Sequence, residues 1–600
     1  MKDRPTDIIS IERARTLPGL FLERTERSPD KVAYRYFDSP SAQWCELTWS
    51  DMARYIACWQ AGLIDDGFKR GDHVAIMLPN GREWVAFEQA ALGMGLVVIP
   101  LYVNDRAENV AYILEHANVK ALLLQGREQW RSLQSIRPTL NKLARVISVD
   151  DVGDESSLNV RALVEWLPPL GETLRSDVCK RDDLATIVYT SGTTGKPKGV
   201  MLSHNNILWD AHSSMHSIPS YPDDVFLSFL PLSHTLERTA GYYLPMMAGA
   251  EVAYARSIPL LPEDLLTIRP TVLISVPRIF ERVALKVQSA LNEKGGVTPV
   301  LFATAVSVGW RRFLHQQHRA PWHPSLAAWP VFETLVAQKI LDKFGGRVRV
   351  AVCGGAPLSQ HVAKIFVGLG MPLVQGYGMT ETSPVVAVNK LENNDPASVG
   401  EPLKDVEVRI APDGELLVRG PGVMMGYWKN DKATRETISD DGWLHTGDKA
   451  EIRDKRIYIT GRLKEIIVLA NGEKVPPSDM EAAIIMDGLF DQAMVIGEGK
   501  AYLCALVVVN PTQWEILVKQ TGYRGDPQDA QRDPDMLSAV LARIGKCLHD
   551  FPGYAQIRRV AVSLEPWTVD NELMTPTLKL KRAKIMDRYA QDISDLYHGH

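Results

Sequence analysis

A short segment rich in glycine, hydroxyl side chains and lysine is the part of the sequence best suited to chemistry. Residues 189–199 read YTSGTTGKPKG, with three glycines, four Ser or Thr hydroxyls and two lysines. Glycines let backbone N–H groups turn towards an anion, hydroxyls add donors, and a lysine adds positive charge. A flexible surface turn is the plain alternative. The density of donors favours a phosphate-binding loop.

The spacing differs from that of a Walker P-loop, which has four residues between its glycines and Ser or Thr after its Lys. Here two residues separate Gly192 from Gly195, and Pro197 follows Lys196. The segment instead resembles the signature loop of adenylate-forming enzymes, the superfamily of acyl-CoA synthetases, luciferases and peptide-synthetase adenylation domains. The resemblance implies that the ATP phosphates are held by Thr190, Ser191, Gly192, Thr193, Thr194, Gly195 and Lys196.

A second motif, QGYGMTET at residues 375–382, places an aromatic ring between glycines and a carboxylate beside hydroxyls. An aromatic ring can stack on a base, and a carboxylate suits Mg²⁺ because this ion prefers oxygen ligands. The family resemblance implies that Tyr377 faces adenine, Thr380 lies near the α-phosphate and Glu381 binds Mg²⁺. It also makes Thr190 the loop hydroxyl that approaches the same ion. The other expected nucleotide-binding residues are Gln375, Gly376, Gly378 and Met379, with Gly355, Ala356 and Pro357 at the adenine-binding edge.

Two further motifs lie later in the chain, GWLHTGD at residues 442–448 and GRLKE at residues 461–465. A short acid can accept hydrogen bonds from both ribose hydroxyls, and Asp448 matches the family's ribose-binding aspartate. The second motif resembles the family's domain hinge, which implies that Arg462 contacts the nucleotide and Lys464 is the pivot. A hinge has a chemical reason, because adenylation and thioester formation need different groups at one acyl carbonyl.

The last candidate is a lysine within MTPTLKLKR, residues 574–582. Most of the superfamily has Gly-Lys at the catalytic position, and Leu578 replaces that glycine here. Aligning Thr575 with the family pattern makes Lys579 the catalytic lysine, and Lys581 stays open as the alternative. The competing interpretation is a basic, solvated strand near the C-terminus.

The acid substrate is expected to bind beside an apolar strand that ends at His234. A lone histidine after a strand is most often structural, but this one resembles the family segment that lines the carboxylate pocket. The same resemblance assigns Gly241 and Tyr242 to the acyl pocket. The segment 269–282 contains Val-Pro-Arg and resembles the long-chain fatty-acid branch of the superfamily.

The elements that must position these residues alternate between strand and helix patterns through the first part of the chain. Such alternation is typical of parallel sheets covered by helices. The fold class is therefore α/β, a large N-terminal region of helix-covered sheets with a small β-rich subdomain, a hinge, and a small α+β C-terminal domain. We expect an N-terminal adenylation domain over residues 1–463 and a mobile C-terminal domain over residues 464–600.

Composition and charge fit an ordinary globular protein of 600 residues, with 45% hydrophobic residues and a formal charge of −5. This balance does not favour nucleic acid as a partner. The six cysteines show no metal-like spacing, and the N-terminus lacks the apolar core of a secretion signal, so we expect a cytoplasmic protein. The mostly helical segment 283–344 could rest peripherally on the inner face of a membrane, or simply pack on the body. The oligomeric state is not determined by the sequence.

Together the motifs predict ATP-dependent activation of a long-chain fatty acid to acyl-AMP, with pyrophosphate release and transfer to coenzyme A. ATP, Mg²⁺ and coenzyme A are thus the expected cofactors and cosubstrates. Three alternatives stay open. The acid could be medium-chain or aromatic, the acceptor could be a carrier-protein thiol, or the chain could bind nucleotide without catalysis.

Overall fold

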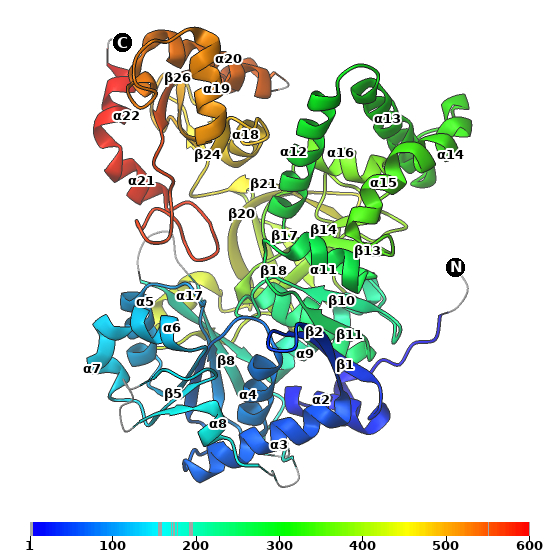
Figure 1. The fold of residues 1–600 in the computed structure, drawn as a ribbon, viewed down its shortest axis with the longest axis vertical. Coiled ribbons are helices and arrows are strands. Elements are labelled where there is room, and N and C mark those ends of the chain that lie inside the picture. Colours follow the sequence, from blue (N-terminus) through cyan, green and yellow to red (C-terminus); the bar gives the residue numbers. More distant parts are fainter. Residues whose placement is uncertain are drawn as a thin grey trace.

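A computed structural model describes residues 4–153, 159–169, 171, 174–176, 178–190, 196–549 and 551–598. The described part forms a large body and, above it in Figure 1, a smaller orange and red body built from the C-terminal segment. Mixed α/β architecture with a small C-terminal unit is what the sequence predicts.

The first sheet of the large body has eight strands, of which β3 to β8 run parallel to one another. The order is β19-β9-β8-β4-β3-β5-β6-β7. The strands are β3 (His73–Met77), β4 (Val97–Pro100), β5 (Val119–Leu124), β6 (Arg145–Ser148), β7 (Val160–Ala162), β8 (Leu184–Thr190), β9 (Lys198–Ser203) and β19 (Gly426–Tyr427). β8 and β9 pair antiparallel on either side of the expected phosphate loop, so that loop connects two adjacent strands.

The second sheet has nine strands in the order β16-β15-β14-β13-β12-β10-β11-β1-β2. They are β1 (Val32–Asp38), β2 (Gln43–Thr48), β10 (Val225–Ser228), β11 (Glu251–Tyr254), β12 (Val272–Ser275), β13 (Val350–Cys353), β14 (Leu373–Gly378), β15 (Val385–Val388) and β16 (Glu401–Pro402). Its central strands, β11 to β14, are parallel. Their carboxyl ends therefore share one edge, where open α/β sheets bind ligands.

Helices between the two sheets bury the largest apolar core, and other helices cover the outer faces. The inner layer contains α2 (Leu17–Arg27), α3 (Trp49–Asp65), α4 (Arg82–Gly93), α9 (His204–Ser217), the π-helix η2 (Glu237–Tyr243) and α10 (Leu244–Ala248). Outside lie α5 (Ala107–His116), α6 (Arg127–Ser132), α7 (Arg137–Leu140), α11 (Leu261–Ile268), α12 (Pro277–Lys294), α13 (Thr298–Gln316) and α16 (Gln360–Gly368). Short helices also occur at α1 (Ile11–Ala14), η1 (Gln134–Ile136) and α8 (Leu163–Trp166).

The start of α9 shows how the sequence ends the phosphate-loop hairpin. Ser203 accepts a hydrogen bond from the backbone N–H of Asn206, whose side chain accepts from the Ser203 backbone in return. This capping box satisfies two N–H groups that have no partner inside the helix. It places the helix directly after β9, as the sequence predicts.

A four-stranded antiparallel sheet forms the small β-rich subdomain of the large body, in the order β17-β18-β20-β21. The strands are β17 (Glu407–Ile410), β18 (Glu415–Arg419), β20 (Leu444–Arg453) and β21 (Arg456–Arg462). The DG turn predicts the β17–β18 hairpin, and the register Val408 opposite Val418 confirms it. The helix α17 (Asp431–Thr437) connects this subdomain back to β19.

The small body packs helices on a three-stranded sheet in which β24 (Phe490–Ile496) pairs antiparallel with β25 (Leu503–Val509). The third strand, β26 (Ile557–Ser563), runs parallel to β25. The helices are α18 (Pro477–Ile484), α19 (Pro511–Thr521), α20 (Pro534–Cys547), α21 (Arg582–Arg588) and α22 (Ala590–Tyr597), with 3₁₀ turns η7 (Asp529–Arg532) and η8 (Gly553–Ala555). A short hairpin of β22 (Ile467–Val468) and β23 (Lys474–Val475) follows the hinge.

The segment between α12 and β13 is mostly helical, as the sequence predicts. After α13 it contains η3 (Pro324–Ala328), α14 (Trp329–Phe332), η4 (Glu333–Ala337), α15 (Gln338–Leu341) and η5 (Asp342–Phe344). These helices form one corner of the large body in Figure 1, and several of their side chains join the core on the outer face of the second sheet. None of the helices in the described ranges is both long and apolar enough to cross a membrane.

Candidate active site

The carboxyl edge of the second sheet brings the expected adenine-binding residues close to each other. β13 leads into Gly354, Gly355, Ala356 and Pro357, and the neighbouring β14 ends in Tyr377 and Gly378. Gly355 has φ +79°, a conformation that favours glycine. A Cβ at Gly378 would lie 2.7 Å from the carbonyl carbon of Pro384, so only glycine fits there. Both turns can thus approach a flat ligand closely.

Asp448 connects two other expected nucleotide-binding residues, Tyr377 and Arg462. Its carboxylate accepts hydrogen bonds from the Tyr377 hydroxyl at 2.6 Å and from Arg462 Nε at 2.9 Å. Burial and the Asp448 charge raise the pKa of Tyr377 well above its ordinary value, so the phenol stays a donor. The β14, β20 and β21 strands therefore present one connected acidic and aromatic surface.

Glu381 lies in the 3₁₀ turn η6 (Thr380–Thr382), directly after β14, and Thr380 opens that turn. The Oε1 atom of Glu381 accepts a hydrogen bond from the Tyr427 hydroxyl at 2.8 Å. The ammonium group of Lys198 lies 4.8 Å from the centre of the Tyr427 ring. Since Lys198 begins β9, the carboxylate lies beside the exit of the phosphate-loop hairpin.

The loop itself is described only at its ends. Ser191, Gly192, Thr193, Thr194 and Gly195 lie outside the described residues. On the near side, the Thr190 hydroxyl donates to the Lys198 carbonyl at 3.5 Å, and on the far side Lys196 lies 5.0 Å from the Tyr112 ring centre. Both ends emerge at the same edge of the first sheet.

Lys579 is brought among these groups by a hairpin from the small body. Desolvation, followed by the positive charge of Arg462, lowers the pKa of the Lys579 ammonium, while the carboxylates of Asp448, Glu465 and Glu381 act in the opposite direction. Lys581 instead acts electrostatically on Asp105, at the base of the hairpin. Of the two lysines that the sequence leaves open, the structure thus brings Lys579 to the nucleotide-binding residues.

The side chain of Gln375 points into the protein. Its Oε1 accepts from the Leu358 N–H at 2.8 Å, and its Nε2 donates to the Ser398 carbonyl at 3.4 Å. Met379 contributes through its backbone N–H instead, which donates to the Pro384 carbonyl at 3.0 Å. These two residues hold the loops around the site, and Gly376 lies between them in β14.

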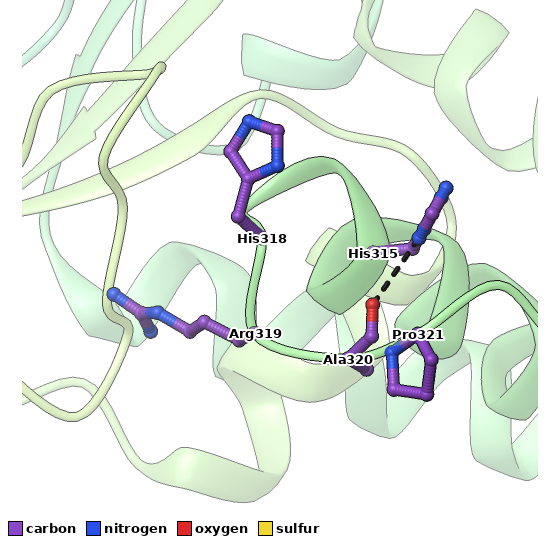
Figure 2. Close-up of a pocket in the computed structure, with 5 residues that line it drawn as sticks. All are labelled: His315, His318, Arg319, Ala320 and Pro321. Carbon is purple, nitrogen blue, oxygen red and sulfur yellow. Dashed lines mark hydrogen bonds between the residues drawn. The ribbon is translucent and has the colours of Figure 1, made fainter.

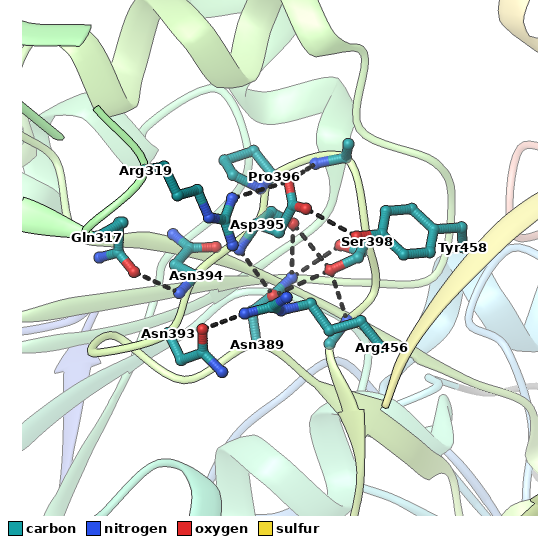
Figure 3. A network of polar contacts seen from close by, with 12 residues as sticks. Gln317, Arg319, Asn389, Asn393, Asn394, Asp395, Pro396, Ser398, Arg456 and Tyr458 are labelled. Carbon is teal, nitrogen blue, oxygen red and sulfur yellow. Dashed lines mark hydrogen bonds and ion pairs between the residues drawn. The ribbon is translucent and has the colours of Figure 1, made fainter. Parts of the chain in front are cut away.

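Figure 3 shows the polar network that anchors Ser398 behind the site. Asn389 donates to the Ser398 carbonyl at 2.7 Å, and Asp395 accepts from the Tyr458 hydroxyl at 2.9 Å. Arg319, from the segment after α13, pairs with the same Asp395 at 3.2 Å. The helical corner and the β-rich subdomain are thereby tied to the loop that supports β14.

On the acyl side, His234 follows β10 and lies close enough to Lys579 to feel its charge. Burial, with a smaller contribution from Lys579, lowers the pKa of His234 to about 4, so the imidazole is neutral at pH 7. Its Nδ1 accepts a hydrogen bond from the Leu236 N–H at 3.2 Å. The neutral ring can therefore line a pocket without repelling the lysine.

The π-helix η2 contains the other two expected acyl-pocket residues and an unexpected carboxyl. Glu237 is 1% exposed, its Oε2 has no hydrogen-bond partner among the described residues, and burial raises its pKa to about 8. A Cβ at Gly241 would lie 2.6 Å from the Glu237 carboxyl carbon. Tyr242 is fully buried, and its hydroxyl accepts from Gln89 at 2.6 Å. Glu237 stands directly before Arg238 in a stretch that also contains His234 and two threonines, so no local pattern marks it as a buried, unpaired acid.

A separate surface pocket lies at the end of α13 and is shown in Figure 2. His315, His318, Arg319, Ala320 and Pro321 line it, and His315 Nδ1 lies 3.2 Å from the Ala320 carbonyl oxygen. No carboxylate or thiol lines it, and the described residues contain no group of three or more potential metal ligands. This pocket is not part of the candidate site.

The AMP-binding enzyme family matches residues 21–428, and the family of AMP-binding enzyme C-terminal domains matches residues 464–600. The chain belongs to the AMP-binding enzyme family. The two matches follow the order of the structure, with the nucleotide-binding edge in the first and the small body that carries Lys579 in the second.

Relatives within this AMP-binding family extend over nearly the whole chain. The long-chain-fatty-acid–CoA ligase FadD15 of Mycobacterium bovis is 31% identical, covering 97% of this chain and 96% of that protein. The chloroplastic long-chain-fatty-acid–[acyl-carrier-protein] ligase AEE15 of Arabidopsis thaliana is 28% identical, covering 97% and 87%. Among solved structures, the adenylation domain of a carboxylate reductase from Mycobacterium chelonae has a TM-score of 0.77 at 21% identity, over 97% and 91% of the two chains. That last likeness concerns the fold.

Sequence reasoning did not find the contacts that orient the site. Tyr427 lies 46 residues from Glu381 in the sequence, and no motif around this tyrosine indicates that the two residues meet. Arg106 and Glu572, which meet across the two bodies, are 466 residues apart. No local pattern signals such pairs, because they arise from tertiary packing.

Proposed function

We propose that the chain is an AMP-forming long-chain fatty acid–CoA ligase. The observation that carries the proposal is the meeting of Lys579, Asp448, Arg462 and Glu381 between the two bodies. The family and the fatty-acid ligases among its relatives support the same activity. ATP, Mg²⁺, a fatty acid and coenzyme A are the implied small molecules.

In the first half-reaction the fatty-acid carboxylate attacks the α-phosphorus of ATP, forming acyl-AMP and releasing pyrophosphate. Negative charge builds on the phosphoryl oxygens, so fixed positive groups stabilise the transition state. Lys579 is proposed to contact these oxygens, and the loop residues 190–196 to bind the leaving phosphates. Asp448 accepts from the ribose hydroxyls while Tyr377 faces adenine. Gly355, Ala356, Pro357 and Gly378 allow the base to approach the backbone.

The residues present fit Mg²⁺ in one respect, the hard oxygen donor of Glu381. Mg²⁺ is usually bound by one or two carboxylates together with substrate phosphates and water, so a single carboxylate beside the phosphate loop is sufficient. The Tyr427 hydroxyl on Oε1 orients the carboxylate and leaves Oε2 for the ion. Thr190 is the proposed hydroxyl near it. When bound, the ion would neutralise charge on the phosphates.

In the second half-reaction the thiol of coenzyme A attacks the acyl carbonyl and AMP leaves, giving the thioester. Lys579 lies where it serves adenylation, so the small body must rotate to bring other groups to the acyl carbon. Lys464 is the proposed pivot. It is exposed and lies two residues after Arg462, in a turn where the Glu465 N–H bonds the Arg462 carbonyl at 2.9 Å.

A carrier-protein thiol is the second candidate acceptor, because one relative at 28% identity is named as an acyl-carrier-protein ligase. The acyl pocket is proposed to begin at His234 and continue past Glu237 towards Gly241 and Tyr242. A medium-chain or aromatic acid is the alternative substrate of the same pocket. Both alternatives keep the adenylation chemistry. The first changes only the thiol that accepts the acyl group, and the second changes only the acid.

A cytoplasmic location with peripheral membrane contact is also proposed, through the mostly helical segment over residues 283–344. This stretch contains seven Arg or Lys residues and three Asp or Glu residues, against a net charge of −5 for the chain. Its exposed large apolar side chains are Val297, Val300, Trp322, Val331 and Leu335. Apolar side chains among basic ones suit an anionic lipid surface. Sedimentation with phosphatidylglycerol vesicles but not phosphatidylcholine vesicles would agree, and failure to bind both would exclude the contact.

Thioester formation with ATP, Mg²⁺ and coenzyme A across straight-chain acids from acetate to oleate tests the proposal. A maximum among the long chains is expected. Pyrophosphate release without a coenzyme A thioester would redirect the proposal to a carrier protein, which can be tested by adding one. A maximum at short chains would overturn the long-chain assignment, and the absence of any product would overturn the ligase.

A further inference from the structure

Lys579 is carried by a hairpin whose own hydrogen bonds fix its shape. Met574 and Leu580 form an antiparallel bridge, and the Lys581 N–H donates to the Leu573 carbonyl at 2.9 Å. At the tip, the Lys579 N–H donates to the Thr575 hydroxyl at 3.0 Å. Because Leu573 and Met574 are buried in the core of the small body, the hairpin moves with that body. Its red trace descends towards α5 in Figure 1.

The first residue before this hairpin contacts the large body directly. Glu572 forms a close ion pair with Arg106, the residue immediately before α5. The second oxygen of the same carboxylate accepts from Lys584 of the small body at 3.1 Å. Glu572 is therefore shared between one cation on each side of the interface. Its backbone has φ +66°, a conformation that a non-glycine residue adopts rarely.

The last residue of the hairpin, Lys581, acts electrostatically on an acidic residue of the same loop of the large body. Asp105 precedes Arg106, and its Oδ1 accepts from the Arg106 N–H at 2.8 Å and from Asn109 at 2.9 Å. Lys581 is the largest source of positive charge acting on Asp105. The residue before the hairpin, Glu572, thus contacts a basic residue of the large body, and the positive charge of Lys581 acts on the acidic neighbour of that residue.

We propose that Arg106 is a positioning residue for adenylation, which holds the base of the 573–581 hairpin through Glu572 so that Lys579 reaches the nucleotide. This inference rests on the proposed function. When the small body rotates for thioester formation, this ion pair separates. Away from the hinge, another hydrogen bond between the bodies is that of Arg278 with the Asp491 carbonyl, at 3.4 Å. Because the described residues of the two bodies make few polar contacts with each other away from the hinge, one ion pair can influence the arrangement of the bodies.

The size of the effect follows from the exposure of the pair. The side chains of Arg106 and Glu572 are 30% and 38% exposed. Ion pairs of that exposure shift an equilibrium by about two- to fivefold, and salt weakens them. The pair should therefore bias the adenylation arrangement without locking it, which suits an enzyme that must leave this arrangement in every turnover.

The test measures the two half-reactions separately, acyl-adenylate formation by pyrophosphate release and thioester formation from supplied acyl-adenylate. Glu572→Gln should lower the first rate by about two- to fivefold and leave the second unchanged or faster. Lys584→Gln is the matched control, because it removes the partner of the same carboxylate within the small body. It should leave both rates close to wild type.

Charge reversal separates positioning from loss of structure. Arg106→Glu should slow adenylation by about tenfold, because it faces Glu572 with a like charge beside Asp105 and Glu108. Adding Glu572→Arg should recover most of that rate. Adenylation by the wild type should also fall as salt is raised from about 0.05 to 0.5 M, more steeply than adenylation by Glu572→Gln.

The inference fails if Glu572→Gln slows both half-reactions equally, if Lys584→Gln slows adenylation as much, or if the double reversal recovers nothing. The activity of the wild type distinguishes failure of this inference from failure of the proposed function. A wild type that makes neither acyl-adenylate nor thioester overturns the proposed function itself. An active wild type whose variants do not separate the half-reactions overturns only the positioning role.

Discussion

The nucleotide-binding surface and the lysine hairpin are held in place in very different ways. The surface is cross-linked within the large body, where Asp448 bonds both Tyr377 and Arg462, and Glu381 bonds Tyr427. The hairpin belongs to the small body and reaches that surface across an interface where the described residues make few polar contacts, such as the ion pair of Arg106 with Glu572.

This difference matches what the two regions are proposed to do. ATP and AMP occupy the same surface in both half-reactions, so its groups benefit from being fixed in advance. The lysine is needed in only one half-reaction, so it benefits from leaving. A residue of the fixed surface should therefore affect both steps when it is changed, whereas a residue of the hairpin should affect adenylation alone.

The largest expected effect is at the tip of the hairpin. Lys579→Met should lower acyl-adenylate formation by about 10²- to 10³-fold, because a positive charge at the developing oxyanion is lost. Transfer from supplied acyl-adenylate should be spared. Lys581→Met is the matched control and should lose only a few-fold, since its charge acts on Asp105. Equal loss of both half-reactions in Lys579→Met would contradict the division between the two regions.

The fixed surface is probed at its central acid. Asp448→Asn should raise the KM for ATP by about tenfold or more, because charged hydrogen bonds to Arg462 and to the ribose are weakened. It should slow the use of supplied acyl-adenylate as well. Asp440→Asn, an exposed acid of the same subdomain, should change neither value. If Asp448→Asn slows adenylation alone, the claim that residues of the fixed surface serve both half-reactions is contradicted.

A smaller effect is expected at the metal-binding part of the fixed surface, in the Mg²⁺ dependence of adenylation. Glu381→Ala should raise the Mg²⁺ concentration for half-maximal adenylation by about tenfold. Tyr427→Phe, which only removes the hydrogen bond that orients this carboxylate, should shift it in the same direction by less. Titration of Mg²⁺ at saturating ATP gives both values, and an unchanged metal dependence in Glu381→Ala would remove that residue from the site.

The acyl side is tested through stability. Glu237 holds its proton in the native state up to a pKa of about 8, whereas an exposed glutamate loses it near 4.5. The native state thus binds the extra proton between these values, and its stability falls as pH rises from about 4.5 to 8. Glu237→Gln should abolish this dependence, so the Tm of the variant minus that of the wild type should grow with pH. A difference independent of pH would show that the carboxyl is not buried as described.

The smallest effect is expected beside the lysine. Leu578 is 62% exposed and has φ +60°, a left-handed conformation that glycine adopts without strain. Leu578→Gly should keep adenylation within about twofold of wild type, because the hairpin conformation is retained. Leu578→Val should lower it more, since a β-branched residue resists that backbone. A severe loss in the glycine variant would give the leucine side chain a role of its own.

Much of the fold and most of the nucleotide edge could be predicted from the sequence because their signals are local. The alternating strands and helices gave the parallel sheets, the DG turn gave β17–β18, and Ser203 marked the start of α9. Tyr377, Asp448 and Arg462 come together as the motifs predict, although 71 residues separate the first two.

Other features could not be predicted because no local pattern encodes them. One is the role of the Gln375 side chain in holding the Leu358 loop from inside, while its expected contact with the nucleotide stays a prediction. The last motif favours Lys579 over Lys581 only through the alignment of Thr575. In the structure Arg462 and the carboxylates of the site act on Lys579, whereas Lys581 acts on Asp105. Tyr427 reaches Glu381 through the packing of β19 against β9.

The most direct test of the account tethers the two bodies in the arrangement described here. A chain with Arg106→Cys and Glu572→Cys would be joined by a short, reducible thiol crosslinker, with each single variant treated alike to control for the native cysteines. The account predicts that the joined enzyme forms acyl-adenylate and releases pyrophosphate but makes no thioester until the link is reduced. Thioester formation at the unlinked rate would contradict it, because the lysine would then not need to leave.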